Sequence, residues 1–289
     1  YLGPVDGHDI RKLYKTFQEA KRVDHAVLVH VLTKKGKGYV PAEENPSRFH
    51  GIVPFDIETG EAKEKSSKDS YTDIFSKVFC DIAKQNDAVV GITAAMADGT
   101  GLARFARMFP DRFFDVGIAE EHALTFAAGL AAGGLKPVVA VYSSFLQRAF
   151  DQTIHDVCLQ NLPVMIAVDR AGLVGSDGET HQGLFDLSFL NMIPNMTILS
   201  PKNRWEMADM VRFCADFQYP VALRYPRGAA YEGLSAFRTP IVYGKSEILY
   251  EEEDIAVIFV GHMAELAVQV RDRLKEIGYH CSLINARFV

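Results

Sequence analysis

The sequence predicts an α/β protein with an open, mostly parallel sheet that is covered by helices on both faces. Short apolar runs rich in β-branched residues alternate with longer stretches whose apolar side chains recur at helical spacing. The apolar runs are nearly continuous, as is typical of strands buried on both faces. Helices of ten or more residues separate the strands, and this order favours parallel pairing.

The composition is that of a globular protein. The 289 residues are 48% hydrophobic and 24% charged, and the length suggests about two domains. The net charge of −6 argues against a nucleic-acid-binding protein, which usually presents a basic face. No apolar run approaches the ~18–20 residues of a membrane span, and residues 1–4 do not resemble a signal peptide. Four widely spaced cysteines indicate reduced core thiols in a cytoplasmic protein: Cys80, Cys158, Cys214 and Cys281.

The first part of the chain predicts one helix and one strand before a long irregular stretch. Residues 9–21 carry apolar side chains at helical spacing, with Asp9 as the expected N-cap, and residues 26–32 predict a strand. Residues 36–70 are rich in glycine, proline and, over 61–69, charge, which predicts a linker and a domain boundary.

A regular alternation of strands and helices follows, and it ends in a second irregular stretch over 226–254. Residues 255–284 then predict the beginning of another α/β unit. The predicted helices cover 71–84 (capped by Ser70), 119–132, 145–160, 204–217 and 263–277, and the predicted strands cover 88–92, 113–116, 138–141, 164–168, 221–223, 255–260 and 280–284.

Ligands of parallel sheets bind at the carboxyl ends of the strands, so the loops there are the places to look for chemistry. Glu120 follows the strand expected at 113–116 and stands in the first turn of a helix, where its anion is favoured. A capping carboxylate without a catalytic role would occupy the same position. Phe145 follows another strand, and its ring could belong to the core or stack on a flat heterocycle.

The loop over 169–183 gathers glycines with polar side chains, among them Arg170, Asp177 and His181. It is either a surface loop or part of a binding site. It lacks the pattern of a nucleotide-binding P-loop, and one histidine makes a weak metal site. Arginine binds phosphate through two parallel hydrogen bonds. Four arginines in an acidic protein predict a pocket for a small anion such as a sugar phosphate: Arg148, Arg170, Arg224 and Arg227.

Taken in order, several strings resemble the 1-deoxy-D-xylulose-5-phosphate synthase family, thiamine-diphosphate enzymes of the transketolase group. The similarity spans nearly the whole chain, and it depends on the number and order of the strings. They are YLGPVDGHD at 1–9, KKGKGY at 34–39, PAE at 41–43, GIAE at 117–120, YSSFLQRA at 142–149, DRAG at 169–172, DGETHQG at 177–183 and RYPRG at 224–228.

The resemblance implies a role for each matched residue. Glu120 would hydrogen-bond the aminopyrimidine ring of thiamine diphosphate, Phe145 would stack on that ring, and Ile118 would line the cofactor site. The cofactor supplies the organic chemistry. His181 and His8 are candidates for proton transfer, and the sequence does not divide the roles between them. The side chains implied for the acceptor site are Tyr142, Arg148, Arg170, Asp177, His181 and Arg227.

The implied reaction condenses pyruvate with D-glyceraldehyde 3-phosphate to 1-deoxy-D-xylulose 5-phosphate and carbon dioxide. The product feeds isoprenoid, thiamine and pyridoxal synthesis. The family also implies a cytoplasmic homodimer, in which the helix over 123–132 could pack against a second copy or lie within one subunit. The resemblance divides the chain into the tail of a diphosphate-binding domain with a linker (1–60), a pyrimidine-binding domain (70–230) and the beginning of a C-terminal domain (240–289).

One departure from the family pattern has a functional consequence. The Gly-Asp-Gly…Asn motif that binds magnesium and the cofactor diphosphate does not occur, so no metal ligand is expected here, and the Mg²⁺ ligands are expected in the part of the first domain that the chain does not contain. We therefore expect these 289 residues to be inactive alone. The alternatives are transketolase, the β subunit of a 2-oxo-acid dehydrogenase, and a non-catalytic module that keeps the thiamine-enzyme fold.

Overall fold

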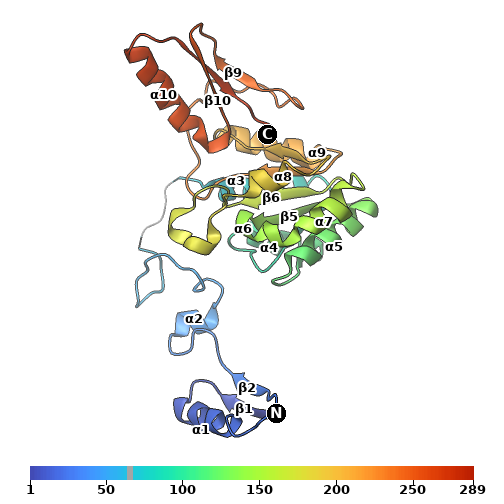
Figure 1. The fold of residues 1–289 in the computed structure, drawn as a ribbon, viewed down its shortest axis with the longest axis vertical. Coiled ribbons are helices and arrows are strands. Elements are labelled where there is room, and N and C mark those ends of the chain that lie inside the picture. The colour runs from blue at the N-terminus through green and yellow to red at the C-terminus, as the bar shows by residue number, and fades with distance from the viewer. Residues whose placement is uncertain (64–67) are drawn as a thin grey trace. The chain divides into compact units, whose positions relative to one another are not determined.

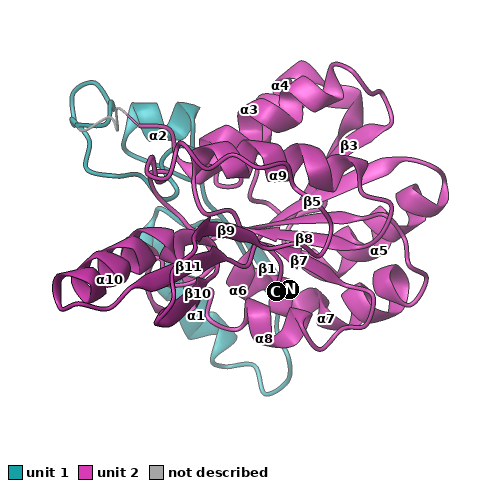
Figure 2. Ribbon diagram, turned by 90° about the horizontal axis from the view of Figure 1, so that it is seen from above, with its two compact units in different colours: residues 1–65 teal, residues 66–289 magenta. Residues whose placement is uncertain are grey.

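The computed structural model describes residues 1–63 and 68–289 (Figure 1). The chain forms two compact units, residues 1–65 and residues 66–289, which Figure 2 shows in different colours. Part of the charged run expected as a linker over 61–69 falls on residues 64–67, outside the described residues. The division of the chain into three domains stays a prediction.

The first unit begins with a small parallel β-α-β element. Strand β1 (Leu2–Asp6) pairs with β2 (Val29–Leu32), and α1 (Ile10–Ala20) joins them. The predicted cap is confirmed, because the Asp9 carboxylate accepts the Lys12 N–H at 3.1 Å. Strand β1 was not expected, and β2 begins later than predicted. A short helix, α2 (Val40–Glu44), was also missed.

The second unit confirms the predicted fold class. Its six-stranded sheet has the order β4-β3-β5-β6-β8-β7, and every neighbouring pair is parallel. The strands are β3 (Val89–Thr93), β4 (Phe113–Asp115), β5 (Lys136–Tyr142), β6 (Met165–Asp169), β7 (Thr197–Leu199) and β8 (Val221–Arg224), of which β7 was not expected.

Helices cover both faces of this sheet (Figure 1). One face packs against α3 (Tyr71–Ala83), α4 (Leu102–Met108) and α9 (Arg204–Asp216), and the other against α5 (Glu120–Ala132). In β5, Val138 and Ala140 belong to the first core and Val139 and Val141 to the second. This alternation is the two-residue period of a strand buried on both sides, and it explains the continuous apolar runs of the sequence.

The helix predicted over 145–160 is broken into shorter pieces. Helix α6 (Ser143–Leu146) and α7 (Phe150–Gln152) are followed by a wide π-helical turn over Thr153–Cys158. A further short helix, α8 (Asp186–Leu190), was not predicted. The cap of α3 is confirmed, since Ser70 and Asp73 form a reciprocal capping box.

The last part of the second unit is a three-stranded sheet, β10-β11-β9, with one helix against it. Strands β10 (Ile255–Phe259) and β11 (Cys281–Asn285) are parallel, while β9 (Glu247–Tyr250) runs antiparallel to β11 and was not predicted. Helix α10 (Ala264–Glu276) is close to its prediction.

A buried ionic cluster links this small sheet to the region of α9. We call it the closed cluster, and its members are 0–4% exposed: Lys202, Glu206, Glu247, Asn285 and Arg287. Lys202 Nζ lies 3.1 Å from Glu206 and also binds Glu247, and Arg287 reaches both carboxylates at 2.8 and 3.1 Å. The Asn285 amide donates to both Glu206 oxygens at 3.0 Å.

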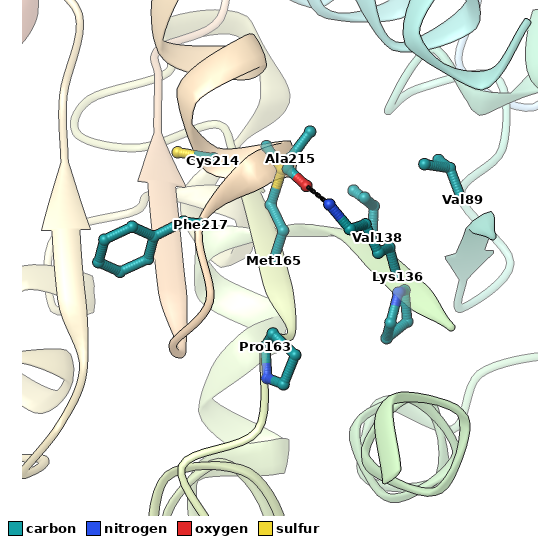
Figure 3. Close-up of a pocket in the computed structure, with 9 residues that line it drawn as sticks. Val89, Lys136, Val138, Pro163, Met165, Cys214, Ala215 and Phe217 are labelled. Atoms are coloured by element: carbon teal, nitrogen blue, oxygen red, sulfur yellow. Dashed lines mark hydrogen bonds between the residues drawn. The ribbon is translucent and has the colours of Figure 1, made fainter. Parts of the chain in front are cut away.

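Two further findings concern the interior. All four cysteines are buried and free, as predicted, and burial raises the pKa of Cys158 to about 12. A hollow of about 10 Å³ lies near the first residues of β3, β5 and β6, where Lys136 Nζ donates to the Ala215 carbonyl oxygen at 3.3 Å (Figure 3). It has room for about one water molecule and lies at the amino edge of the sheet, away from the predicted chemistry. Within 1–63 and 68–289, no helix is both long and apolar enough to cross a membrane.

Candidate active site

The predicted chemistry lies at the carboxyl edge of the six-stranded sheet. Strands β4, β5, β6 and β8 end at Asp115, Tyr142, Asp169 and Arg224. Because these strands are parallel, the loops that follow them emerge at one edge. Most of the expected site residues follow these strand ends.

Glu120 is the first residue of α5 and is 2% exposed. The turn before it is fixed by Asp115, whose carboxylate accepts the N–H groups of Ala95 and Gly117 at 2.8 and 3.0 Å. The carboxylate oxygens of Glu120 lie 3.3 and 3.4 Å from Arg148 Nη1. The Glu120 side chain is therefore buried at the start of the helix, with Arg148 as its charged partner.

Aromatic side chains continue the site from Arg148. The Arg148 guanidinium lies 5.8 Å from the centre of the Phe145 ring. That ring in turn lies 5.7 Å from Tyr142, nearly parallel to it, and 5.2 Å from His181, nearly edge-on. Phe145 is half-buried, so part of its ring remains accessible. These contacts connect the buried carboxylate to the loop after β6.

The other end of the site is a group that we call the open cluster: Tyr142, Asp169, Arg170, Asp177 and Arg227. The Arg170 guanidinium lies 4.2 Å from the Tyr142 ring centre, 3.0 Å from Asp169 and 3.6 Å from Asp177. Asp177 also accepts a hydrogen bond from Arg227 Nη1. Burial raises the pKa of Tyr142, which keeps the phenol protonated at neutral pH.

Several buried polar atoms at this edge have no hydrogen-bond partner among the described residues. They include Arg170 Nε, Asp177 Oδ2 and the hydroxyls of Ser143 and Ser144. Buried polar groups are normally bonded, so unsatisfied donors and acceptors gathered at one edge indicate a position for a polar ligand. Over 1–63 and 68–289, no group of three His, Cys, Asp or Glu side chains could hold a metal ion.

The contacts therefore join eight of the predicted site residues into one continuous series. It runs from Glu120 through Arg148, Phe145, His181, Tyr142, Arg170 and Asp177 to Arg227.

Two other predicted residues lie outside this series. Ile118 is 78% exposed on the turn before α5. His8 lies in the first unit, where its Nε2 accepts the Lys34 N–H at 2.7 Å.

The expectation that Arg224 helps bind an anion is wrong. Its side chain is 5% exposed and donates to both oxygens of Asp186, at 2.7 and 3.3 Å. This paired geometry uses the donors that an anionic ligand would need. Arg224 is the last residue of β8, whereas Arg227 comes after the strand end, and the number of arginines could not reveal this difference.

Three residues at the site were not anticipated: Thr72, Gly99 and Asp169. Thr72 Oγ1, from the first turn of α3, donates to Asp169 at 2.7 Å. The Gly99 carbonyl accepts a hydrogen bond from Arg170 Nη1, and a Cβ at Gly99 would lie 1.7 Å from the Tyr142 hydroxyl. The position of Asp169 at a strand end was the available signal, while Thr72 and Gly99 are remote in sequence and gave none.

Comparison with known proteins shows the family of the chain. The sequence profile described as "Transketolase, pyrimidine binding domain" matches residues 67–232, which is more than half of the chain, and the chain belongs to this family. A second profile, described as "1-deoxy-D-xylulose-5-phosphate synthase", matches residues 1–33.

Its close relatives are curated 1-deoxy-D-xylulose-5-phosphate synthases, which are transketolase-type transferases. The protein from Lachnoclostridium phytofermentans is 56% identical over the whole of this chain, and that from Aquifex aeolicus is 52% identical. The chain spans 46% of the length of each.

Solved structures show the same fold. A split-gene transketolase, described as an inactive β4 tetramer, has a TM-score of 0.69 and 27% identity over 76% of this chain and 72% of its own. The transketolase of Campylobacter jejuni has a TM-score of 0.68 at 18% identity, covering 86% of this chain and 39% of its own. At that identity the likeness concerns the fold alone.

Proposed function

We propose that this chain supplies the pyrimidine half of a thiamine-diphosphate site and most of an acceptor site, in an enzyme that makes 1-deoxy-D-xylulose 5-phosphate from pyruvate and D-glyceraldehyde 3-phosphate. The observation that carries the proposal is the contact series from the buried carboxylate of Glu120 to the guanidiniums of Arg170 and Arg227. Its two ends match the two things such an enzyme must hold, a basic heterocycle and a phosphate.

The residues present fit the pyrimidine ring of the cofactor. A carboxylate with 2% exposure can hydrogen-bond a ring nitrogen away from water, and the half-buried Phe145 ring offers a flat apolar face. When bound, thiamine diphosphate supplies the carbanion chemistry at its thiazolium ring. Ile118 would add an apolar contact from the exposed turn before Glu120.

The acceptor aldehyde would lie over the open cluster. Arg170 and Arg227 would bind its phosphate, with Arg148 adding positive charge nearby. Asp177 Oδ2, which has no hydrogen bond within the described residues, could accept one from the substrate hydroxyl. Tyr142 would form the wall beside Arg170. The His181 ring is half-buried near Phe145 and could move a proton at the reacting carbonyl, a role for which His8 is the other candidate.

The rest of the enzyme is proposed from the relatives. The diphosphate and Mg²⁺ would be held by the part of those proteins that this chain does not span, so we propose that these 289 residues are inactive alone. The description of the split-gene transketolase as inactive supports this. We further propose a homodimer in the cytoplasm, where four free buried thiols would stay reduced. Its role would be in isoprenoid and thiamine synthesis.

The test uses a completed enzyme, in which the chain replaces the matching segment of the Lachnoclostridium phytofermentans relative. We expect it to release carbon dioxide from pyruvate and form the pentulose phosphate, and the isolated chain to form none. A completed enzyme that used only a ketose donor, as transketolase does, would contradict the proposal. Product from the isolated chain would contradict its inactivity.

Glu120→Gln tests the cofactor half of the site, and Glu121→Gln is its matched control. The two carboxylates are adjacent in the first turn of α5, but Glu120 is buried and Glu121 is exposed. Losing a group that acts on the cofactor should lower kcat by about 100-fold or more, within the range for positioned acid–base groups. Thiamine diphosphate affinity, measured by fluorescence titration, should fall in Glu120→Gln only. Equal losses in both variants would contradict the assignment.

A further inference from the structure

Asp169 is a completely buried carboxylate to which the proposed reaction assigns no role. It ends β6, is 0% exposed, and collects three donors. The backbone N–H of Arg170 donates to its Oδ1 at 2.7 Å, Thr72 Oγ1 donates to its Oδ2 at 2.7 Å, and Arg170 Nη1 lies 3.0 Å from the same Oδ2. Burial raises the pKa of Asp169, and these donors oppose that shift because they favour its carboxylate form.

The backbone of Arg170 is in the left-handed region, with φ of +57°. This conformation is uncommon for a residue with a side chain and persists where surrounding contacts determine it. Here the Asp169 carboxylate binds both the N–H and the guanidinium of Arg170. The same side chain therefore holds the turn of the backbone and the direction of the long arginine side chain.

The bonds of the Arg170 guanidinium are divided unequally between its two edges. Nη1 is used by Asp169 and by the Gly99 carbonyl, and one face of the group lies against Tyr142. Among the described residues, neither Nε nor Nη2 donates a hydrogen bond, and the buried Nε approaches Asp177 Oδ2 only to 3.6 Å. The Nε–Nη2 edge can bind two oxygens of one anion at once.

We propose that Asp169, supported by Thr72, is a positioning residue that fixes Arg170 so that its Nε–Nη2 edge is presented to the phosphate of the acceptor. The Asp169 carboxylate and the Gly99 carbonyl hold Nη1, so that Nε lies 3.6 Å from Asp177 Oδ2 without a hydrogen bond to it. This inference rests on the proposed function, because it takes Arg170 to bind the phosphate. It predicts that Asp169 affects the use of a phosphorylated acceptor without touching the substrate.

The experiment compares D-glyceraldehyde 3-phosphate with D-glyceraldehyde as acceptors in the completed enzyme. Asp169→Asn keeps the size of the side chain and removes its charge. We expect KM for the phosphorylated acceptor to rise about 10-fold or more, the value of one charge-assisted hydrogen bond, with kcat changed by less than about 3-fold. With D-glyceraldehyde, kcat/KM should stay within about 2-fold, since that substrate lacks the group that the arginine holds.

Asp186→Asn is the matched control. Asp186 is also a buried aspartate, 1% exposed, and it is paired with Arg224, which is outside the series of contacts at the site. Its loss should lower the melting temperature as Asp169→Asn does, but leave the ratio of the two acceptors unchanged. Thr72→Val, which keeps both charges, should raise KM for the phosphorylated acceptor in the same direction by a smaller factor. If Asp169→Asn does not fold, Thr72→Val provides the test in its place.

Arg170→Ala distinguishes a failure of the proposed acceptor site from a failure of the positioning role of Asp169. If it leaves the preference for the phosphorylated acceptor unchanged, the proposed acceptor site is wrong. If it removes the preference while Asp169→Asn and Thr72→Val do not alter it, the positioning role is wrong and the proposed function stands. In the double variant, Asp169→Asn should add nothing to Arg170→Ala, because its effect acts through that arginine.

Discussion

The open cluster at the site and the closed cluster beside α9 contain the same number of charged side chains, but only the closed cluster has all of its buried polar atoms hydrogen-bonded. Each combines two cations with two carboxylates: Arg170 and Arg227 with Asp169 and Asp177, and Lys202 and Arg287 with Glu206 and Glu247. Each is therefore close to neutral as a whole. Their difference lies in how many of the donors and acceptors are used.

In the closed cluster, no side-chain atom is left buried without a partner over the residues that the structure describes. Asn285 adds hydrogen bonds to both carboxylates, and the spare donors of Arg287 reach the backbone oxygens of Thr239 and Pro240. A group that is buried and saturated has nothing left with which to bind a ligand. Its function is to hold the small sheet against the rest of the unit.

In the open cluster, Arg170 Nε and Asp177 Oδ2 are buried and lie 3.6 Å apart, and neither atom has a hydrogen-bond partner in the described part of the chain. Such atoms cost free energy in the folded protein unless a ligand or water satisfies them. The comparison teaches that buried charge by itself does not mark a binding site. Buried charge with unused donors and acceptors does.

The largest effect that can test this comparison is on stability, at the closed cluster. Lys202→Met removes one cation of similar size and leaves Glu206 and Glu247 with Arg287 as their remaining cation. We expect the free energy of unfolding to fall by about 3–5 kcal/mol, as when one partner of a buried pair is deleted. Urea unfolding followed by tryptophan fluorescence and circular dichroism measures it.

Lys77→Met is the control for that loss. Lys77 pairs with Asp69 at 2.7 Å, but its side chain is about half exposed. An exposed pair of this kind should cost less than about 1 kcal/mol. Equal urea midpoints for the two variants would show that burial and saturation do not distinguish the closed cluster from a surface ion pair.

Gly99→Ala should have an intermediate effect on stability, and it should act through the open cluster. A Cβ would lie 1.7 Å from the Tyr142 hydroxyl, so the ring and the Gly99 carbonyl that binds Arg170 must separate. We expect overpacking to cost about 1–3 kcal/mol of stability. The KM for glyceraldehyde 3-phosphate should also rise, as measured by steady-state kinetics of the completed enzyme.

Gly51→Ala is its control, since no atom lies within 4 Å of the added methyl group. It should leave stability within about 0.5 kcal/mol of the parent, as expected for a surface substitution. If Gly99→Ala lowered stability but left the KM for the phosphorylated acceptor unchanged, the contact between Gly99 and Arg170 would not matter for the site.

The smallest expected effect concerns His262, a half-buried side chain outside both clusters with one buried ring nitrogen. Burial and the nearby Arg224 lower its pKa, against the opposing charge of Asp186, and its Nδ1 has no partner among the described residues. The folded state therefore favours the neutral ring, while the unfolded chain takes up a proton below about pH 6.5. Stability should fall as the pH is lowered through that value, by at most about 1.4 kcal/mol per pH unit.

The measurement is the urea midpoint of the parent and of His262→Leu between about pH 7.5 and pH 5, a range that brackets the ordinary histidine pKa. The parent should lose more stability than the variant as the pH falls. Parallel curves would mean that His262 is not held neutral. They would also mean that an unpartnered buried atom carries no measurable cost at this position.

Much of the fold could be predicted because the local signals agree with the tertiary outcome. Ser70 begins α3, and the continuous apolar runs became strands buried on both faces. The missed strands β1, β7 and β9 are short and contain polar or conformationally unusual residues, and their pairing partners, not their own pattern, make them strands. The helix over 145–160 was drawn as regular because a π-helical turn leaves no sequence signal.

The sequence by itself determined the fold class and most of the residues at the carboxyl edge, because strand ends and helix starts are local features of the chain. Tertiary structure alone decided which donors and acceptors of the charged side chains are hydrogen-bonded within the protein and which are not. Arg224 is paired with Asp186 and Arg170 keeps an open edge, although both are arginines next to strand ends. Pairing depends on groups far apart in the chain, such as Thr72 and Asp169, that only the packed sheet brings within hydrogen-bonding distance.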